Sequence, residues 1–363
     1  MIRINIRRTA SATLLGMGLL VASGTMAATV YTETNSVQGN EVQIYETGAD
    51  GVLALAGQVS TGGLGTGAGL GNQGALALTE DHRWLIAVNA GSSEISAFAV
   101  ERTGLVLVDR VASGGTGPVS VTVHGDLLYV LNAGGTGNIA GFRILGSGHF
   151  LPIAHSSQPL SSATAGAAQI GFDREGERLV VTEKATNNIS VYAVEGGRAH
   201  GPMAHPSNGL TPFGFAFDRH DDLLVSEAFG GQPNAAALSS YDLGGDTGAL
   251  KVISGSVPAN QTAACWVVLT DHYAYVTDTG SGTITGYRVS RAGELTSLSA
   301  DGRTGVTGGG PTDAAASRNG KELYVLSPSI GQIVRFHVNA DGTVTLLGST
   351  PGAAGTATGL ITR

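Results

Sequence analysis

Short apolar stretches, separated by polar or glycine-rich turns, run along nearly the whole chain. Six of them share one pattern, two apolar segments of strand length around a short turn, and they cover 84–100, 127–144, 179–194, 223–243, 274–289 and 323–338. β-Branched and aromatic residues are frequent in both segments, which favours a β-hairpin. The copies recur every roughly 45 to 50 residues, a repeat length typical of propeller blades.

Each hairpin has the same neighbours. An apolar segment opened by Pro or a small residue precedes it, as in PVSVTV and PFGFAFD, and a Gly turn with one more strand follows it, as in RTGLVLVDRVAS. The unit therefore contains four antiparallel strands, which we call a to d. Such a unit, repeated radially, is a blade of a β-propeller.

The two ends of the chain complete the ring. A seventh hairpin, ATVYTETNSVQGNEVQIYET, begins at Ala28 without a strand a, and the C-terminal GTATGLITR reads as a strand a without partners. Pairing them removes the open edge of the ring. We predict an all-β fold, a seven-bladed β-propeller of four-stranded antiparallel blades over residues 28–363, without an amphipathic helix.

The first 27 residues have the features of a signal peptide. Arg3, Arg7 and Arg8 precede an apolar run at 12–22, and a small-residue end follows at Thr25-Met-Ala27. The run is too short for a membrane span. We therefore expect a periplasmic or secreted monomer with no membrane span after signal removal.

Composition limits the partners of the exported chain. Residues 28–363 contain 17 basic and 28 acidic residues, a formal charge of −11, which disfavours nucleic acid as a partner. Cys265 is the only cysteine, so no intramolecular disulfide stabilises the fold. Gly accounts for 56 of 363 residues, which indicates many tight turns.

One glycine-rich stretch formally matches a nucleotide-binding fingerprint. Gly69-Leu-Gly71-Asn-Gln-Gly74 fits GxGxxG, with Glu94 in the place of a ribose carboxylate. The fingerprint requires a helix after the glycines. Here ALALT and WLIAVNA follow, two strand-like segments around a polar turn, so we expect no nucleotide and place these glycines in a d-to-a connection.

The repeat resembles a known family. The pattern LYV-x-NAGS-x-x-I-x-x-F-x-V followed by G-x-L, carried by LIAVNAGSSEISAFAV, YVLNAGGTGNIAGFRI and YVTDTGSGTITGYRV, is similar to that of the lactonase family, which includes bacterial 6-phosphogluconolactonases and fungal carboxymuconate-lactonising enzymes. The resemblance covers essentially residues 29–363. It implies hydrolysis or formation of a lactone of a small organic or sugar acid. The export signal argues against a phosphorylated cytosolic substrate.

Two rings of residues are expected around one mouth of the channel. The strand-b ring, at the end of each strand b, consists of Glu33, Asn89, Asn132, Glu183, Glu227, Asp278 and Ser327. These side chains either accept hydrogen bonds from turn N–H groups or form a carboxylate cluster suited to acid–base chemistry. The strand-a ring, at the third position of each strand a, consists of Ala75, Ser120, Gln169, Gly214, Trp266, Asp313 and Thr358.

Lactone hydrolysis needs a base, an oxyanion donor and a proton for the leaving oxygen. We predict Glu183 and Glu227 as base and acid, with His205 reaching the mouth from the connection between their blades. Substrate contacts are expected from the two rings, from the residue after Glu183 and from a loop of blade six: Asn89, Asn132, Lys184, Gln169, Trp266, Asp278, Arg303 and Asp313.

Other constellations are absent from the sequence. There is no GxSxG elbow, no HExxH and no metal-type pair of Cys or His residues, so we expect no metal site and no cofactor. Ca²⁺ at the carboxylate-rich mouth is the alternative. The alternative function is a non-catalytic propeller that binds a protein or glycan through its loops.

Overall fold

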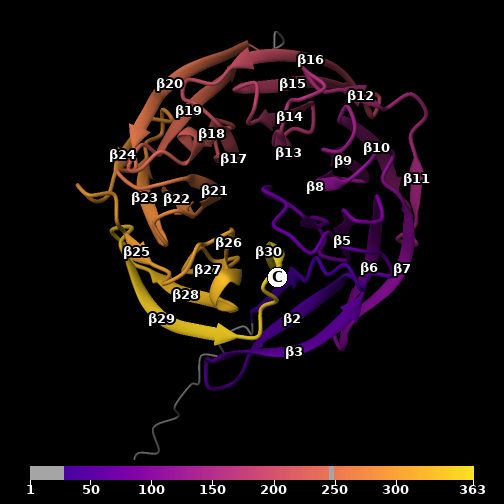
Figure 1. Ribbon diagram of the computed structural model, residues 1–363, viewed down its shortest axis with the longest axis horizontal. Coiled ribbons are helices and arrows are strands. Elements are labelled where there is room, and N and C mark those ends of the chain that lie inside the picture. The colour runs from indigo at the N-terminus through magenta and orange to yellow at the C-terminus, as the bar shows by residue number, and fades with distance from the viewer. Residues whose placement is uncertain (1–27, 245–248) are drawn as a thin grey trace, which may run out of the picture.

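Seven antiparallel sheets are arranged radially around one axis in the computed structural model, which describes residues 28–244 and 249–363 (Figure 1). Blade one consists of β30 (Thr358–Thr362), β1 (Thr29–Glu33), β2 (Glu41–Thr47) and β3 (Leu53–Ser60). Blade two consists of β4 (Leu76–Leu78), β5 (Trp84–Asn89), β6 (Glu94–Glu101) and β7 (Gly104–Ala112). Blade three consists of β8 (Pro118–His124), β9 (Leu127–Asn132), β10 (Asn138–Ile144) and a divided outer strand, β11 (Phe150–Pro152) and β12 (Gln158–Pro159).

The other four blades follow in chain order. Blade four consists of β13 (Ala167–Phe172), β14 (Arg178–Glu183), β15 (Asn188–Glu195) and β16 (Arg198–Pro206). Blade five consists of β17 (Pro212–Phe217), β18 (Leu223–Glu227), β19 (Ala237–Gly244) and β20 (Ala249–Pro258). Blade six consists of β21 (Ala264–Leu269), β22 (Tyr273–Asp278), β23 (Thr283–Val289), β24 (Leu295–Ser297) and β25 (Gly305–Val306). Blade seven consists of β26 (Asp313–Ala316), β27 (Glu322–Ser327), β28 (Gln332–Val338) and β29 (Val344–Pro351).

The C-terminal strand closes the ring as predicted. β30 pairs antiparallel with β1, with Tyr31 opposite Ile361 and Thr32 opposite Leu360. The first hairpin, β1 and β2, thereby acquires its strand a from the other end of the sequence. The prediction of a seven-bladed all-β propeller is confirmed.

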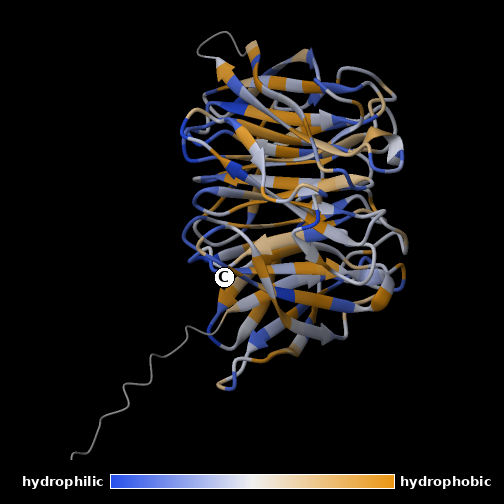
Figure 2. Ribbon diagram, turned by 90° about the vertical axis from the view of Figure 1, so that its left-hand side faces the viewer, coloured by the Kyte–Doolittle hydropathy of each residue, from blue (hydrophilic) through white to orange (hydrophobic). Residues whose placement is uncertain are grey.

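The core lies between neighbouring blades. The middle strands b and c are almost completely buried, whereas the outer strands d alternate between buried and exposed positions. Figure 2 shows the same distribution, with hydrophobic residues along the strands and hydrophilic residues at many of the turns. Buried tyrosines join adjacent blades, since Tyr129 Oη donates to Gly197 O at 3.1 Å and Tyr275 Oη donates to Gly342 O at 2.8 Å.

The upper face, as we call it, carries the b-to-c turns and the d-to-a connections; the lower face carries the a-to-b and c-to-d turns. Helix in the described residues is limited to two 3₁₀ turns of the upper face, η1 (Phe229–Gly231) and η2 (Pro328–Ile330). No helix in the described part of the chain is long and apolar enough to cross a membrane. The strand β4, not a helix, follows the glycines at 69–74, as predicted. The predicted signal peptide, residues 1–27, lies outside the described residues.

Candidate functional site

The strand-b ring is buried in all seven blades. Each of its side chains is no more than 1% exposed. In four consecutive blades, the ring residue accepts a hydrogen bond from the d-to-a connection that arrives from the preceding blade. The contacts are Thr61 Oγ1 to Asn89 at 2.6 Å, Ser113 Oγ to Asn132 at 2.6 Å, Ser161 N to Glu183 at 3.0 Å and Gly209 N to Glu227 at 2.8 Å. The ring therefore fastens neighbouring blades together.

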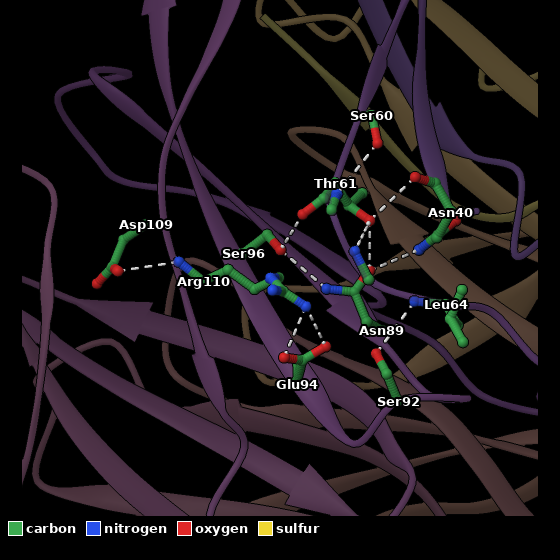
Figure 3. A network of polar contacts seen from close by, with 12 residues as sticks. Asn40, Ser60, Thr61, Leu64, Asn89, Ser92, Glu94, Ser96, Asp109 and Arg110 are labelled. Atoms are coloured by element: carbon green, nitrogen blue, oxygen red, sulfur yellow. Dashed lines mark hydrogen bonds and ion pairs between the residues drawn. The ribbon is translucent and has the colours of Figure 1, made fainter.

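Asn89 shows the arrangement in detail (Figure 3). Its Oδ1 accepts from Thr61 Oγ1 and from Asn40 Nδ2 at 3.2 Å, while its Nδ2 donates to Ser96 Oγ at 2.8 Å. Ser96 Oγ in turn donates to Thr61 O at 2.8 Å. Residues of blades one and two thus form one polar network that is completely buried.

Glu183 and Glu227 have the same kind of surroundings. Both oxygens of Glu183 accept hydrogen bonds: Oε1 from Ser161 N at 3.0 Å and Ser190 Oγ at 2.8 Å, and Oε2 from Thr186 Oγ1 at 2.8 Å and Ser161 Oγ. Glu227 Oε1 accepts from Gly209 N at 2.8 Å and Ser239 Oγ at 2.6 Å, and Oε2 accepts from Ser256 Oγ at 2.6 Å. Neither carboxylate retains an oxygen without a donor, which is the pattern of a structural anchor.

Asp278 differs from these two glutamates. Its Oδ2 accepts from Thr283 Oγ1 at 3.1 Å and Thr285 Oγ1 at 2.8 Å, but the buried Oδ1 has no hydrogen-bond partner among the described residues. Burial raises the pKa of Asp278 to about 7. A carboxyl group that titrates near neutral pH and has one oxygen without a donor is suited to transfer protons.

The glycine-rich connection between blades one and two crosses the upper end of the channel. In Figure 1 it is the violet segment that reaches the middle of the ring. Asn72 accepts from Thr358 Oγ1 at 3.1 Å and donates to Val119 O, and Gln73 N donates to Ala168 O at 3.2 Å. We call residues 71–74 the plug. Its contacts reach strands a on several sides of the ring.

The side chain of Gln73 connects the plug to blade six. Its Nε2 donates to Val267 O at 2.9 Å, and its Oε1 accepts from Val267 N at 3.0 Å. A Cβ atom on Gly214 would lie 2.1 Å from Gln73 Oε1. The glycine in the strand-a ring of blade five is thus required to make room for the Gln73 carboxamide.

Beside the plug, three side chains from blades four to six are stacked. Lys184 Nζ lies 4.6 Å from the ring centroid of Phe213, whose centroid is 5.1 Å from that of Trp266. Lys184 Nζ also donates to Gly71 O of the plug, and burial lowers the pKa of Lys184. Trp266 Nε1 is buried and has no acceptor among the described residues. An unpaired buried N–H is uncommon, and this one is available to donate to a ligand or a water molecule.

Cys265 connects this stack to Asp278. Burial raises the pKa of the Cys265 thiol to about 12, and the charges of both Asp278 and Lys184 act on it. In the sheet, Ala264 is paired with Asp278. We call these five residues the upper site: Lys184, Phe213, Trp266 and Cys265 pack beside the plug, and Asp278, at the end of β22, acts on Cys265 through its charge.

The other predicted residues lie elsewhere or have partners. Both carboxamide atoms of Gln169 bond to the Phe215 backbone, at 3.0 and 2.6 Å. Asp313 is buried, which raises its pKa well above the usual range, and it accepts from Ala314 N at 2.8 Å. Arg303 is exposed and lines an open surface depression with Asn234 and Asn260.

The position of His205 differs from the expected one. The stretch from Arg198 to Pro206, expected as a connection, is β16, the outermost strand of blade four, and His205 faces Ile189 of β15. The stretch pairs with the hairpin as a regular strand d, which the weak apolar alternation of RAHGPMAHP did not indicate. His205 thus lies on the outer strand of its blade, and not in a loop at the channel mouth.

The lower face contains a feature that the sequence analysis missed. A cavity of about 250 Å³ over blades four to seven is lined by Arg174, Arg219 and Arg318, together with Asp218 and Asp271. Each arginine stands two residues after the end of its strand a. Aligning FDR, FDR and ASR across the repeat would have revealed this shared position.

Carboxylates that could share a cation are also on the lower face. Asp173, Glu175 and Asp221 have ligand atoms within 4.8 Å of one another. Asp173 pairs with Arg178 at 3.5 Å, and Asp221 accepts from Arg174 N at 3.0 Å. Protein donors thus already contact two of the three carboxylates, and exposed acidic groups alone do not define a metal site.

Comparisons with known proteins agree with this architecture. The family model "Lactonase, 7-bladed beta-propeller" matches residues 30–148 and 149–269. No curated protein matches the chain.

Three solved structures illustrate the likeness. A Bacteroides fragilis protein provisionally assigned as a 6-phosphogluconolactonase is 17% identical, with 94% of this chain and 99% of that chain covered and a TM-score of 0.75. The periplasmic gluconolactonase of Pseudomonas aeruginosa is 17% identical, with 93% and 98% covered and a TM-score of 0.73. A Lactobacillus plantarum protein is 16% identical, with 93% and 99% covered and a TM-score of 0.75. At these identities the structures share the fold.

Proposed function

This chain belongs to the lactonase family of seven-bladed β-propellers, and we propose that it is an exported enzyme that opens or closes the lactone ring of a small organic or sugar acid. The observation that carries the proposal is the upper site. It contains the Lys184 amine and the unpaired indole N–H of Trp266 beside the plug, and the carboxyl group of Asp278, whose pKa is about 7 and whose charge, like that of Lys184, acts on Cys265.

We assign roles in hydrolysis to three residues of the upper site, Asp278, Trp266 and Lys184. Asp278 in its ionised form accepts a proton from water as the water oxygen attacks the lactone carbonyl carbon. Trp266 Nε1–H and the Lys184 amine donate to the carbonyl oxygen, on which negative charge develops. The ring C–O bond then breaks, and the proton held by Asp278 passes to the departing alkoxide oxygen. Water has been added, and the product is a hydroxy acid.

Access to this site requires motion. Asp278 is completely buried and Trp266 is 5% exposed. The plug touches the site through Gly71 O, which accepts from Lys184 Nζ. Displacing the plug frees the lysine and opens the upper end of the channel, and we propose that substrate enters there.

The sequence predicted Glu183 and Glu227 as base and acid. This alternative can be distinguished from the proposal that Asp278 is the base. The oxygens of the two glutamates are all occupied by donors from their own and neighbouring blades. A catalytic role requires those contacts to break during turnover. Asp278 Oδ1 has no hydrogen-bond donor among the described residues, so no such contact has to break before it accepts a proton.

Export is part of the proposal. The predicted signal peptide at 1–27 supports it, as does the likeness to a periplasmic gluconolactonase, whose fold this chain shares. A sugar-acid lactone outside the cytosol is then the favoured substrate class.

A binding or scaffold propeller is the second candidate. The occupied carboxylates of the strand-b ring favour it, and so do exposed apolar side chains on the upper face. Those side chains are 40 to 56% exposed: Val37, Leu64, Leu210, Val306 and Ile330. Together they would offer an apolar rim to a protein partner.

The test is hydrolysis of a lactone panel by purified protein beginning at Ala28. The rate of acid release is measured for aldonolactones, muconolactones and acyl lactones in turn, with and without Ca²⁺. Turnover of one class above the uncatalysed rate supports the enzyme. Failure with every class, for protein shown to be folded, favours the binding propeller.

A further inference from the structure

The lower-face cavity brings together three arginines from three blades. Arg174, Arg219 and Arg318 follow β13, β17 and β26, the strands a of blades four, five and seven. They come from the same position of the repeat, which the radial symmetry directs towards the lower mouth. The cavity, about 250 Å³, has room for a small metabolite.

Two of the three arginines make no side-chain hydrogen bond or ion pair with the part of the chain that the structure describes. The side chains of Arg174 and Arg318 make no hydrogen bond and no ion pair with any residue in 28–244 or 249–363. Arg219 donates to His220 Nε2 at 3.0 Å and to Asp271 O at 3.4 Å, and it contacts His272 Nδ1 at 3.1 Å. Burial raises the pKa of Asp221 and the charge of Arg174 opposes this rise, but neither Arg174 nor Arg318 forms a side-chain ion pair among the described residues, so the donors of both guanidinium groups remain available to a ligand.

The acidic residues near the cavity are largely engaged. Asp218 is 8% exposed, and its Oδ1 accepts from the N–H groups of His220 and Asp222 at 2.7 and 3.0 Å. Asp173 pairs with Arg178 at 3.5 Å. Three further acidic residues are Asp271, Glu175 and Asp221. Of these, Asp271 lines the cavity, and Asp221 accepts a hydrogen bond from Arg174 N at 3.0 Å.

We propose that the lower-face cavity binds a small anion carrying carboxylate or phosphate groups. Guanidinium groups present forked N–H donors that match the oxygens of both kinds of group. Arg174, Arg219 and Arg318 line the cavity from blades four, five and seven, so a ligand there can meet guanidinium groups of more than one blade. The site is on the face opposite the upper site, so it does not depend on the proposed lactone chemistry.

The test is calorimetric titration of the protein from Ala28 with inorganic phosphate and with succinate at low ionic strength. The Arg174→Gln/Arg318→Gln double variant removes the two cavity arginines that form no side-chain ion pair among the described residues. The Arg83→Gln/Arg102→Gln double variant removes the same charge from blade two, outside the cavity. Both pairs are exposed, so both variants are expected to fold.

The expected result is saturable binding of at least one anion by the wild-type protein. Affinity falls at least about tenfold in the Arg174/Arg318 variant, because charge-assisted hydrogen bonds to the anion are lost, and falls less than about twofold in the Arg83/Arg102 variant. The anion that binds more tightly identifies the group recognised. No saturable binding of either anion, or an equal loss in both variants, overturns the proposal.

Discussion

Gln73 and Val267 are 194 residues apart in the sequence, and two hydrogen bonds join the carboxamide of the first to the backbone of the second. The pair links the connection before blade two to the inner strand of blade six. A side chain here acts as an additional strand partner, and it holds the plug across the channel.

Gln73→Ala is expected to lower the free energy of unfolding by about 2 kcal/mol, because it leaves Val267 N–H and C=O without their partner. Urea denaturation measures the change. Gln38→Ala, at an exposed position of the b-to-c turn in blade one, is the control and is expected to change stability by less than about 0.5 kcal/mol. Equal effects of the two substitutions would contradict the role given to the plug.

The polar network around Asn89 predicts a contrast between buried and exposed contacts. Asn89→Ala removes one buried hydrogen bond each from Thr61, Asn40 and Ser96 and should destabilise the protein by about 2 to 3 kcal/mol. Arg110→Ala removes the nearby surface pair with Glu94, 2.8 Å long, and should reduce stability by less than about 1 kcal/mol. Thermal unfolding of both variants checks the order.

Asp278 makes stability depend on pH. Its pKa in the folded protein is about 7, against an ordinary value of 3.8, because of burial. Between these values the folded state holds a proton that the unfolded state has lost, so stability decreases as pH rises from about 4 to 7.

Replacement of Asp278 by Asn should remove this dependence. The difference in unfolding free energy between Asp278→Asn and wild type should shift in favour of the variant by roughly 2 to 4 kcal/mol between pH 4 and pH 8. Urea titrations at the two pH values measure it, and other buried acids such as Glu33 and Asp313 cancel in the comparison. A difference that does not change with pH would show that Asp278 is not protonated in the folded state.

The Glu183→Gln/Glu227→Gln double variant separates anchoring from catalysis. Each substitution directs an amide NH₂ at hydroxyl or N–H donors, so we expect a loss of about 1 to 3 kcal/mol per site. Activity per folded molecule should stay within about threefold of wild type. Loss of turnover in a variant of unchanged stability would instead restore these residues as acid and base.

The repeat made the fold predictable, whereas the site depended on contacts that the repeat does not encode. Apolar alternation located the hairpins, and the unpaired strand GTATGLITR indicated its pairing with β1. The same alternation identified the end of strand b, but it could not show that Ser161 and Gly209 would cover Glu183 and Glu227. The partner of Gln73 lies four blades away, and no local pattern marks it.

His205 shows a second limit. Its strand has few apolar residues because β16 is at the edge of a blade, where one face and the outer backbone meet solvent. Weak alternation therefore concealed a regular strand. The three arginines of the lower face were visible in the sequence, but only as a position shared between blades.

The most direct test of the proposed chemistry is the steady-state kinetics of Asp278→Asn on the lactone that the wild-type protein hydrolyses best. Loss of a general base predicts a decrease in kcat of at least about 100-fold with KM little changed, in protein that remains folded at the assay pH. If Asp278→Asn keeps wild-type kcat on that lactone, the upper site is not where the ring is opened.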